Sequence, residues 1–304
     1  MWAHHEPRGA QYMGINWVGP ALMRHATPQQ RAQHLPPIAA GEVIWCQGFS
    51  EPEAGSDLAS MRTRAVADDE GWLITGQKVW TSYAQMAGWC VLAAATDPDA
   101  PASGRITLFL LSMDRPGLTV RPIPSMLGPH HLNEVFLDQV RATPDDVLGQ
   151  PGDGWRVIRD ALAHERVGIA RYARCDALLA RVRASLGDEW DALPGGLRAR
   201  WVRAMVDVRV ARLLAYRAVG QQESEQLSDA SASAARIAAT QCDQSVAELL
   251  LEASGPDGLE GGRDAFLHGA VEDHWRYAQA ATVSSGTIEV QRMLVARAAL
   301  GDRR

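Results

Sequence analysis

Small and hydroxyl-bearing residues are concentrated between Trp45 and Asp57. The segment reads Trp-Cys-Gln-Gly-Phe-Ser-Glu-Pro-Glu-Ala-Gly-Ser-Asp, so an apolar run leads into a loop that contains two serines. A strand that runs into such a loop can bring backbone amides and serine hydroxyls close to a flat polar heterocycle or a phosphate. A tight surface turn has the same composition. The segment taken alone leaves both interpretations open.

Two further segments combine glycine with polar or aromatic side chains. The first is Gly-Gln-Lys-Val-Trp-Thr-Ser, from Gly76 to Ser82, and the second is Gly-Thr-Ile-Glu-Val-Gln-Arg, from Gly286 to Arg292. Gly286 and Thr287 are placed to open a helix, where free amides and the positive end of the helix dipole suit a phosphate. An ordinary helix N-cap has the same residues.

The secondary structure that we expect around these segments changes from helix to strand along the first half of the chain. A helix is expected around Gly14 to Ala26, and Thr27 followed by Pro28 opens a second one. From Val43 to about Val147, short β-branched and aromatic runs are separated by turn residues, which predicts an antiparallel β domain. The clearest of these runs are residues 72–75, 89–92, 106–110 and 134–137.

After Gly154 the apolar residues recur with the period of a helix. We expect one long helix to about Leu186, followed by helices at about 196–222, 229–253, 270–281 and 287–300. Long alanine-rich helices are typical of a bundle. The predicted fold is therefore α+β, with a short N-terminal helical segment (residues 1–41), an antiparallel β domain (42–150) and a C-terminal four-helix bundle (151–304).

Composition excludes several classes of protein. The 304 residues are 46% hydrophobic and 22% charged, as in a globular protein with a sizeable core, and the net charge of −6 argues against nucleic acid as a partner. We expect a cytoplasmic protein with no membrane partner, because no apolar run or secretory signal is evident. The four cysteines have no CxxC spacing, so we expect no metal site and no disulfide framework. Lysine occurs once, at Lys78, which we attribute to a general preference for arginine.

Together the three segments resemble the acyl-CoA dehydrogenases in order and approximate spacing, over nearly all of the chain from Gly14 to Asp302. The resemblance implies a β domain before a C-terminal four-helix bundle, with FAD between them. It also implies that Ser50 and Ser82 hydrogen-bond the flavin ring and that Trp80 covers one face of it. Core packing of the Trp80 indole is compatible with that role. The other implied positions are Gln47, Phe49, Thr81, Gly286, Thr287 and Glu289 for the cofactor and Ser56 for the nucleotide end of the substrate.

The reaction of this family needs a carboxylate to remove the α-proton of an acyl thioester while the β-hydrogen leaves as hydride to FAD. Many members place that glutamate directly before the Gly-Thr pair, where this chain has Ser285, whose hydroxyl cannot serve unaided. A minority, including isovaleryl-CoA dehydrogenase and some bacterial members, use a Glu-Arg pair on the first bundle helix. Glu165 and Arg166 match that pair, which implies Glu165 as the base and Arg166 near the substrate or the carboxylate. Without the resemblance they would be read as solvated helix charges.

The chain also departs from the family pattern. Glu53 stands where a glycine is usual, which puts a side chain where the backbone needs freedom. The FAD-diphosphate motif Arg-x-x-Phe-Gly is absent from Tyr172 to Leu186, and residues 254–258 replace the expected Gly-Gly loop. Residues 1–41 correspond to a remnant of the family's N-terminal helical domain. A truncated start, a partner subunit or a decayed gene would each explain the short N-terminus.

Three functions follow from these features. The first is a subunit of an FAD-dependent acyl-CoA dehydrogenase that forms an oligomer with itself or with an unlike chain of the same family. Bacterial heteromeric members share FAD between unlike chains. An electron-transfer flavoprotein would accept the electrons. The second is a noncatalytic partner subunit or pseudoenzyme, and the third is a flavin-dependent oxidase or monooxygenase. The acyl group depends on the shape of the pocket and is not specified by these motifs.

Overall fold

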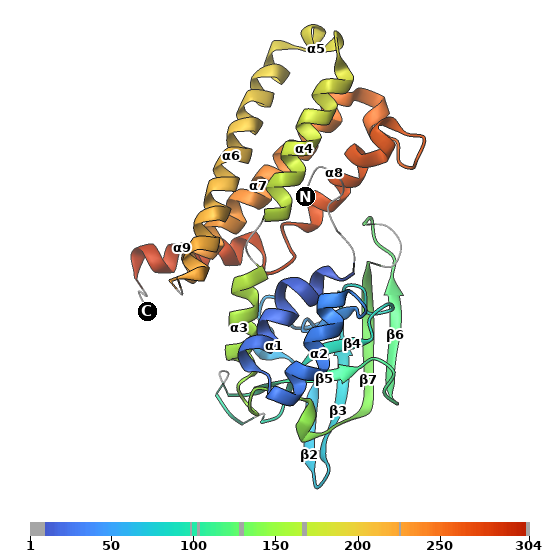
Figure 1. The fold of residues 1–304 in the computed structure, drawn as a ribbon, viewed down its shortest axis with the longest axis vertical. Helices are drawn as coiled ribbons and strands as arrows, with labels where there is room; N and C mark the ends of the chain where they lie inside the picture. The colour runs from blue at the N-terminus through green and yellow to red at the C-terminus, as the bar shows by residue number, and fades with distance from the viewer. Residues whose placement is uncertain are drawn as a thin grey trace. The chain divides into compact units, whose positions relative to one another are not determined.

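The computed structural model describes residues 10–301 except 98, 102–103, 128–130, 166–168 and 225. The described residues form two compact units, one ending at His164 and the other beginning at Glu165. The first unit contains the strands and the second contains the long helices (Figure 1). The predicted α+β class with a C-terminal helical bundle is confirmed. The domain boundaries at residues 41/42 and 150/151 stay predictions.

The first unit is built on one eight-stranded sheet. Its strand order is β6-β7-β3-β2-β4-β5-β8, and β1 pairs with β4. The strands are β1 (Trp45–Gly48), β2 (Arg64–Asp68), β3 (Gly71–Lys78), β4 (Trp89–Ala95), β5 (Ile106–Ser112), β6 (Leu118–Ile123), β7 (Leu132–Ala142) and β8 (Val147–Leu148). The four strand runs predicted from the sequence lie in β3, β4, β5 and β7.

Most neighbouring strands are antiparallel, as predicted, but β1 and β2 each pair with β4 in parallel. Parallel pairs need connections longer than a hairpin turn. The chain between these parallel partners includes the loops 49–63 and 79–88, which contain Ser50, Ser56, Thr81 and Ser82. By contrast, β2 and β3 are joined by a tight turn, with Asp68 opposite Gly71.

Helices of the first unit pack on the sheet and form a core with it. They are a π-helical turn (Gly14–Val18), α1 (Gly19–His25), α2 (Pro28–Ala40) and α3 (Gly154–Glu165). Trp17, Leu22 and Val157 from these helices join Trp45 and Leu108 from the sheet in one buried cluster. A second cluster includes alternate residues of the same strands, so β4 and β5 are buried on both faces.

The sequence places the start of α2 correctly. Thr27 accepts a hydrogen bond from the Gln30 backbone amide, and the Gln30 side chain accepts one from the Thr27 amide, which together form a capping box. The side-chain amide of Gln30 also donates to the backbone carbonyls of Asp145 and Val147, at 2.7 and 2.9 Å. The cap therefore ties α2 to the chain that leads into β8.

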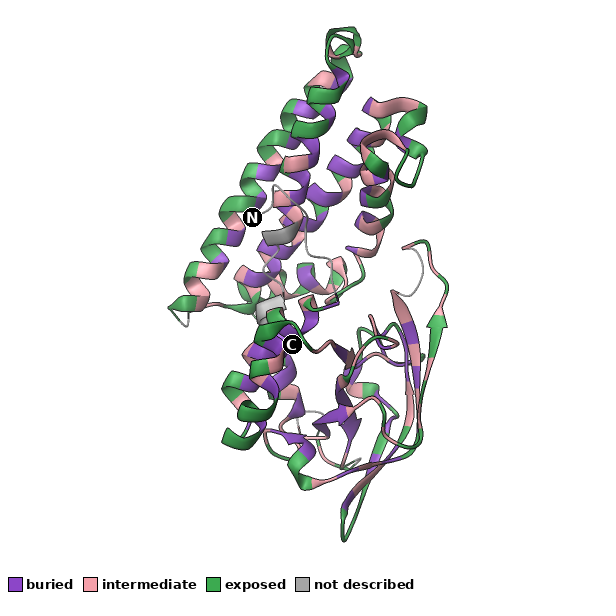
Figure 2. Ribbon diagram, turned by 45° about the vertical axis from the view of Figure 1, so that its right-hand side comes forward, coloured by how far each residue is buried: buried purple, intermediate pink, exposed green. Residues whose placement is uncertain are grey.

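The second unit consists of helices arranged around α7. The helices are α4 (Ile169–Leu186), α5 (Glu189–Ala192), α6 (Gly195–Glu223), α7 (Asp229–Ser254), α8 (Ala270–Ala280) and α9 (Ile288–Leu300). α7 packs against α4, α6, α8 and α9, and its buried residues include many alanines, which allow close helix packing. Figure 2 shows buried residues on the inner sides of these helices and exposed ones outside.

The first long helix predicted from the sequence corresponds to α3 and α4. We expected one helix from residue 155 to about 186, and the structure has α3 up to Glu165 and α4 from Ile169, with residues 166–168 outside the described part of the chain. The two helices belong to different compact units. Short 3-10 turns complete the fold at Leu58–Ser60, Pro144–Asp146, Gly255–Leu259 and Phe266–Gly269.

Candidate functional site

The structure brings two of the three predicted segments together in the first unit. Phe49 and Ser50 follow β1, and Val79 of the second segment follows β3. The Val79 amide donates to the Ser50 carbonyl at 2.9 Å, and the Lys78 ammonium donates to the Phe49 carbonyl at 3.2 Å. One backbone and one side-chain hydrogen bond therefore hold the chain at Phe49 and Ser50 next to the chain that continues into Trp80.

Trp80 lies at the surface, not in the core. Trp80 is 58% exposed. Its φ of 59° is in the left-handed region, which bulky residues rarely adopt. Hydrogen bonds maintain this conformation, because Thr81 N–H donates to the Asn133 carbonyl at 2.9 Å and Asn133 Nδ2 donates back to the Thr81 carbonyl at 3.0 Å. Among the described residues, the Trp80 indole is therefore not part of a core cluster. Such strain concentrates at ligand-binding positions.

Several buried oxygens in or beside the two segments lack hydrogen-bond partners among the described residues. They include Gln47 Oε1, Thr81 Oγ1 and Asn133 Oδ1. Buried polar atoms without partners are rare in native proteins, and a polar ligand is one way to satisfy them. The exposed indole of Trp80, which precedes Thr81 in the chain, fits a flat ligand with polar edges, as FAD is. The residues present therefore fit the cofactor that the resemblance implies.

The remaining predicted residues of the first unit vary in exposure. Ser50 and Ser82 are half-buried, and Ser56 is exposed in the loop before Leu58–Ser60. Phe49 is 5% exposed and packs edge-on against Trp17 with ring centroids 5.7 Å apart. Most of the Phe49 ring thus contacts protein, and its flavin-lining role stays a prediction, as do the roles of the three serines.

Glu53 does not strain the loop. Glu51 and Ala54 exchange two backbone hydrogen bonds, which places Pro52 and Glu53 at the exposed tip of a tight turn. Glu53 is not among the described residues with positive φ. The turn accommodates a side chain where the family usually has glycine.

The third predicted segment lies in the second unit and opens α9. Thr287 is the N-cap and accepts a hydrogen bond from the Val290 amide at 3.3 Å. Gly286 has a φ of 88°, which favours glycine, and a Cβ there would lie 2.7 Å from Gln291 Nε2. The N-cap interpretation is confirmed, and Glu289 is exposed in the first turn. Binding of a cofactor phosphate by Gly286, Thr287 and Glu289 stays a prediction.

Arg236 of α7 is a residue that the sequence reasoning missed. It is 5% exposed, and its guanidinium donates to the Ala281 carbonyl at 3.2 Å and to the Ser284 carbonyl at 2.9 Å. These bonds fix the chain directly before Gly286. A single basic residue within the alanine-rich run 232–239 was the signal that could have drawn attention to it.

The predicted base lies at the edge of the described residues. Glu165 is the last residue of α3, and its side chain is outside the described part of the structure. Arg166 is also outside the described residues. Both roles therefore stay predictions.

A buried charge cluster that the sequence did not predict joins α4, α7 and α8. The carboxylate of Asp243, which is 0% exposed, lies 2.7 Å from Arg171 Nη1 and 3.0 Å from Arg174 Nη2. His274 Nδ1 lies 3.7 Å away, and Cys175 Sγ donates at 3.6 Å. The atoms of Cys175, Asp243 and His274 that could bind a metal ion lie within 4.8 Å of one another. The two guanidinium groups already neutralise the carboxylate and would repel a cation, so this arrangement fits an ion-pair cluster better than a metal site.

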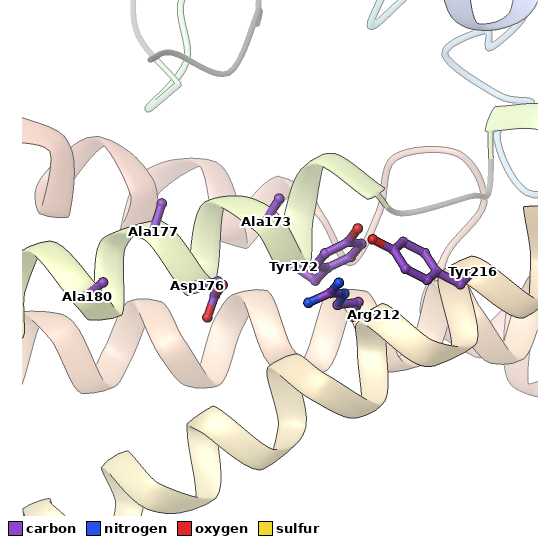
Figure 3. A pocket seen from close by; sticks show the side chains of 7 residues that line it. All are labelled: Tyr172, Ala173, Asp176, Ala177, Ala180, Arg212 and Tyr216. Atoms are coloured by element: carbon purple, nitrogen blue, oxygen red, sulfur yellow. The ribbon is translucent and has the colours of Figure 1, made fainter. Parts of the chain in front are cut away.

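An open groove lies between α4 and α6 (Figure 3). The hydroxyls of Tyr172 and Tyr216 point toward each other above Arg212, and the cavity measures about 360 Å³. Burial, together with the hydrogen bond to Tyr216, raises the pKa of Tyr172 to about 12. None of the predicted site residues lines this groove.

Family models match most of the chain. Residues 46–140 match the acyl-CoA dehydrogenase middle domain, and residues 152–300 match the acyl-CoA dehydrogenase C-terminal domain. The chain belongs to the acyl-CoA dehydrogenase family. Members of this family are FAD-dependent oxidoreductases. Among the described residues of this acyl-CoA dehydrogenase homologue, no helix combines the length and apolar character needed to cross a bilayer.

Individual acyl-CoA dehydrogenases are similar to this chain over most of its length. FadE34 of Mycobacterium tuberculosis is 39% identical over 94% of this chain, which spans 39% of FadE34. IpdE1 of the same organism is 34% identical over 97% of this chain and 76% of IpdE1. Among solved structures, the Tcur3481–Tcur3483 steroid ACAD has a TM-score of 0.90 at 31% identity, covering 97% of this chain and 77% of that one. The ChsE4–ChsE5 complex from Mycobacterium tuberculosis gives 0.86 at 30% identity, covering 97% and 78%.

Proposed function

We propose that this chain is a subunit of an FAD-dependent acyl-CoA dehydrogenase that introduces a double bond between the α and β carbons of an acyl thioester. The observation that carries the proposal is Trp80. A large aromatic side chain is held at the surface in a strained conformation, directly after the contact between Val79 and Ser50. Membership of the family supports FAD as the ligand that Trp80 covers.

The residues of the chain have distinct roles in this proposal. FAD, when bound, supplies the acceptor for the β-hydride. The carboxylate of Glu165 removes the α-proton of the thioester, with Arg166 beside the substrate or the carboxylate. Trp80 keeps water away from the reaction centre, and the hydroxyls of Ser50 and Ser82 orient the ring.

We further propose an acyl thioester of a steroid as the first substrate class to test. Support comes from the solved neighbour named a steroid ACAD, at 31% identity. Ser56, exposed in its loop, would then contact the nucleotide end of the thioester. Reduced protein would pass electrons to an electron-transfer flavoprotein.

The exposed face of α6 supports a second chain in the assembly. α6 buries one face, and on the opposite side Val202, Val206, Val210 and Leu213 are between 46% and 67% exposed. Apolar residues repeated in this way along the exposed side of one helix mark an interaction surface. We propose that an unlike acyl-CoA dehydrogenase chain covers this face and supplies the FAD-diphosphate contacts that α4 lacks, since the neighbouring ACAD structures are two-component assemblies.

Substitution of the α6 face tests the assembly. We expect Leu213→Arg to weaken association at least tenfold, because burying a leucine contributes about 1.5–3 kcal/mol and an arginine would place a charge in the interface. Co-expression with the acyl-CoA dehydrogenase-like chains of neighbouring reading frames, followed by light scattering, measures the mass of the complex. Val66→Arg is the matched control, because Val66 is a valine of similar exposure, 62%, on β2 of the first unit. Equal masses for wild type and Leu213→Arg would contradict an interface on α6.

Substitution of Trp80 tests the flavin site. We expect Trp80→Ala to raise the dissociation constant for FAD about tenfold, since aromatic stacking on a heterocycle contributes about 1–3 kcal/mol. Trp72→Ala serves as an aromatic control because it lies on β3 outside the predicted site, with Phe109 as its ring partner. Titration of the assembled apoprotein with FAD, followed by flavin fluorescence, gives both constants. Unchanged affinity in Trp80→Ala would remove Trp80 from the site.

The visible spectrum of the purified protein separates the competing functions. Flavin bands that bleach on adding a steroid acyl-CoA under nitrogen support the dehydrogenase. Bands that stay oxidised with every acyl-CoA in the assembled complex would favour the noncatalytic subunit. Rapid reoxidation of the reduced protein by oxygen, in preference to an electron-transfer flavoprotein, would favour an oxidase or monooxygenase.

A further inference from the structure

The only lysine of the chain is fully buried. Thirty residues are lysine or arginine, and all except Lys78 are arginine. Lys78 is 0% exposed at the end of β3, two residues before Trp80. In a chain that uses arginine so consistently, a lysine at this position indicates a site where a guanidinium does not fit.

Lys78 and Glu51 connect three segments of the first unit. Lys78 Nζ lies 2.7 Å from Glu51 Oε1 and donates to the Phe49 carbonyl at 3.2 Å. The same carboxylate accepts the backbone amide of Arg62 at 2.5 Å and that of Thr63 at 3.0 Å. The ion pair therefore joins the end of β1, the end of β3 and the chain that enters β2.

Two glycines make room for this arrangement. A Cβ on Gly48 would lie 2.7 Å from Leu92 Cδ1 and 3.4 Å from Lys78 Cγ. A Cβ on Gly76 would lie 2.4 Å from Thr63 Oγ1 and 2.7 Å from Thr63 Cα. The space around the lysine stem and around residue 63 is thus limited by backbone and packed side chains, and a larger cation cannot be accommodated without displacing them.

Burying two charges is costly, and an apolar pair of similar size would often be as stable. Burial alone would raise the pKa of Glu51, but the charge and hydrogen bond of Lys78 and the two backbone amides hold it below its ordinary value. Glu51 is therefore an ionised acceptor that can bind several donors at once. An apolar pair would lose the bonds to Phe49, Arg62 and Thr63.

We propose that Lys78 and Glu51 are positioning residues, whose buried ion pair fixes the two flavin-facing segments to each other and requires an ammonium group. The positioning itself follows from contacts within the first unit. Its effect on a flavin rests on the proposed function.

Hydrogen exchange tests the positioning without a cofactor. We expect Lys78→Met to speed exchange of the Thr63 and Val79 amides at least tenfold, because Glu51 and the Ser50 carbonyl would no longer be held in place. The neutral double variant Glu51→Gln, Lys78→Met removes the buried charges and should show the same local increase. The Leu110 amide, in the buried strand β5, and the variant Glu53→Gln, at the exposed turn tip, are controls that should stay at wild-type rates.

FAD titration of the assembled protein tests the consequence for the site. We expect the double variant and Lys78→Arg to bind FAD about tenfold more weakly and to shift the visible absorption bands of the bound flavin. A purely structural pair would lower stability without changing that spectrum. Wild-type exchange rates and spectrum in the double variant, or in Lys78→Arg, would overturn the proposal. Faster exchange in the variants, with no FAD binding by wild type, would support the positioning and reject the proposed function.

Discussion

Replacing Asp243 with asparagine is expected to lower the free energy of unfolding by about 3–5 kcal/mol, the usual cost of breaking a buried ion pair by removing one partner. Arg171 and Arg174 would keep their charges, and Arg174 is itself 7% exposed. Urea denaturation followed by circular dichroism measures the change. Glu248→Gln is the matched control, because Glu248 is exposed on the same helix.

Acid titration gives a second measurement of the same cluster. Burial alone would raise the pKa of Asp243, but the charges of Arg174 and Arg171 outweigh it and lower the pKa below its ordinary value of 3.8. The stabilising contribution is therefore present above about pH 4 and is lost as the pH falls further, because the unfolded chain then binds a proton that the folded protein does not. Wild type should lose stability more steeply than Asp243→Asn below pH 4. Parallel acid curves would contradict the ion-pair interpretation.

Replacing Glu165 with glutamine is expected to reduce the turnover of an acyl thioester by about 10²–10⁴-fold, the typical contribution of a positioned general base. The amide is close in size to the carboxylate but cannot accept the α-proton. Stopped-flow bleaching of the flavin bands by substrate under nitrogen measures this step, and FAD titration shows whether the cofactor still binds.

A compensating variant sharpens the test of Glu165. Ser285 precedes Gly286, where many members of the family carry the glutamate. Ser285→Glu in the Glu165→Gln background places a carboxylate at that position and is expected to recover part of the rate. Bleaching at the wild-type rate in Glu165→Gln alone would remove Glu165 from the mechanism.

Local sequence signals predicted much of the fold. Thr27 and Gln30 form their capping box within four residues, and the turn from Asp68 to Gly71 is equally local, so both could be read from the sequence. The parallel pairing of β1 with β4 was not predicted, because it depends on strand partners more than 40 residues apart, as Trp45 and Trp89 are.

The sequence predicted the residue types of the candidate site but not the contacts that hold those residues in place. The motifs identified Ser50 and Trp80, whereas the positive φ of Trp80 depends on the pairing of the next residue, Thr81, with Asn133, far away in the sequence. Lys78 lies in one of the motifs, but the presence of a single lysine was attributed to composition. That single occurrence was the signal that Lys78 has a specific role. Asp243 gave no local signal, because its arginine partners lie on another helix.

Arg236 and Asp243 lie seven residues apart on α7, so they occupy nearly the same side of the helix, about 10 Å apart along its axis. One holds the chain before Gly286 and the other holds α4. Since the helix between them is rigid, sliding α7 along its axis would carry both attachments by the same distance. The start of α9 and the packing of α4 are thus mechanically linked through a single helix.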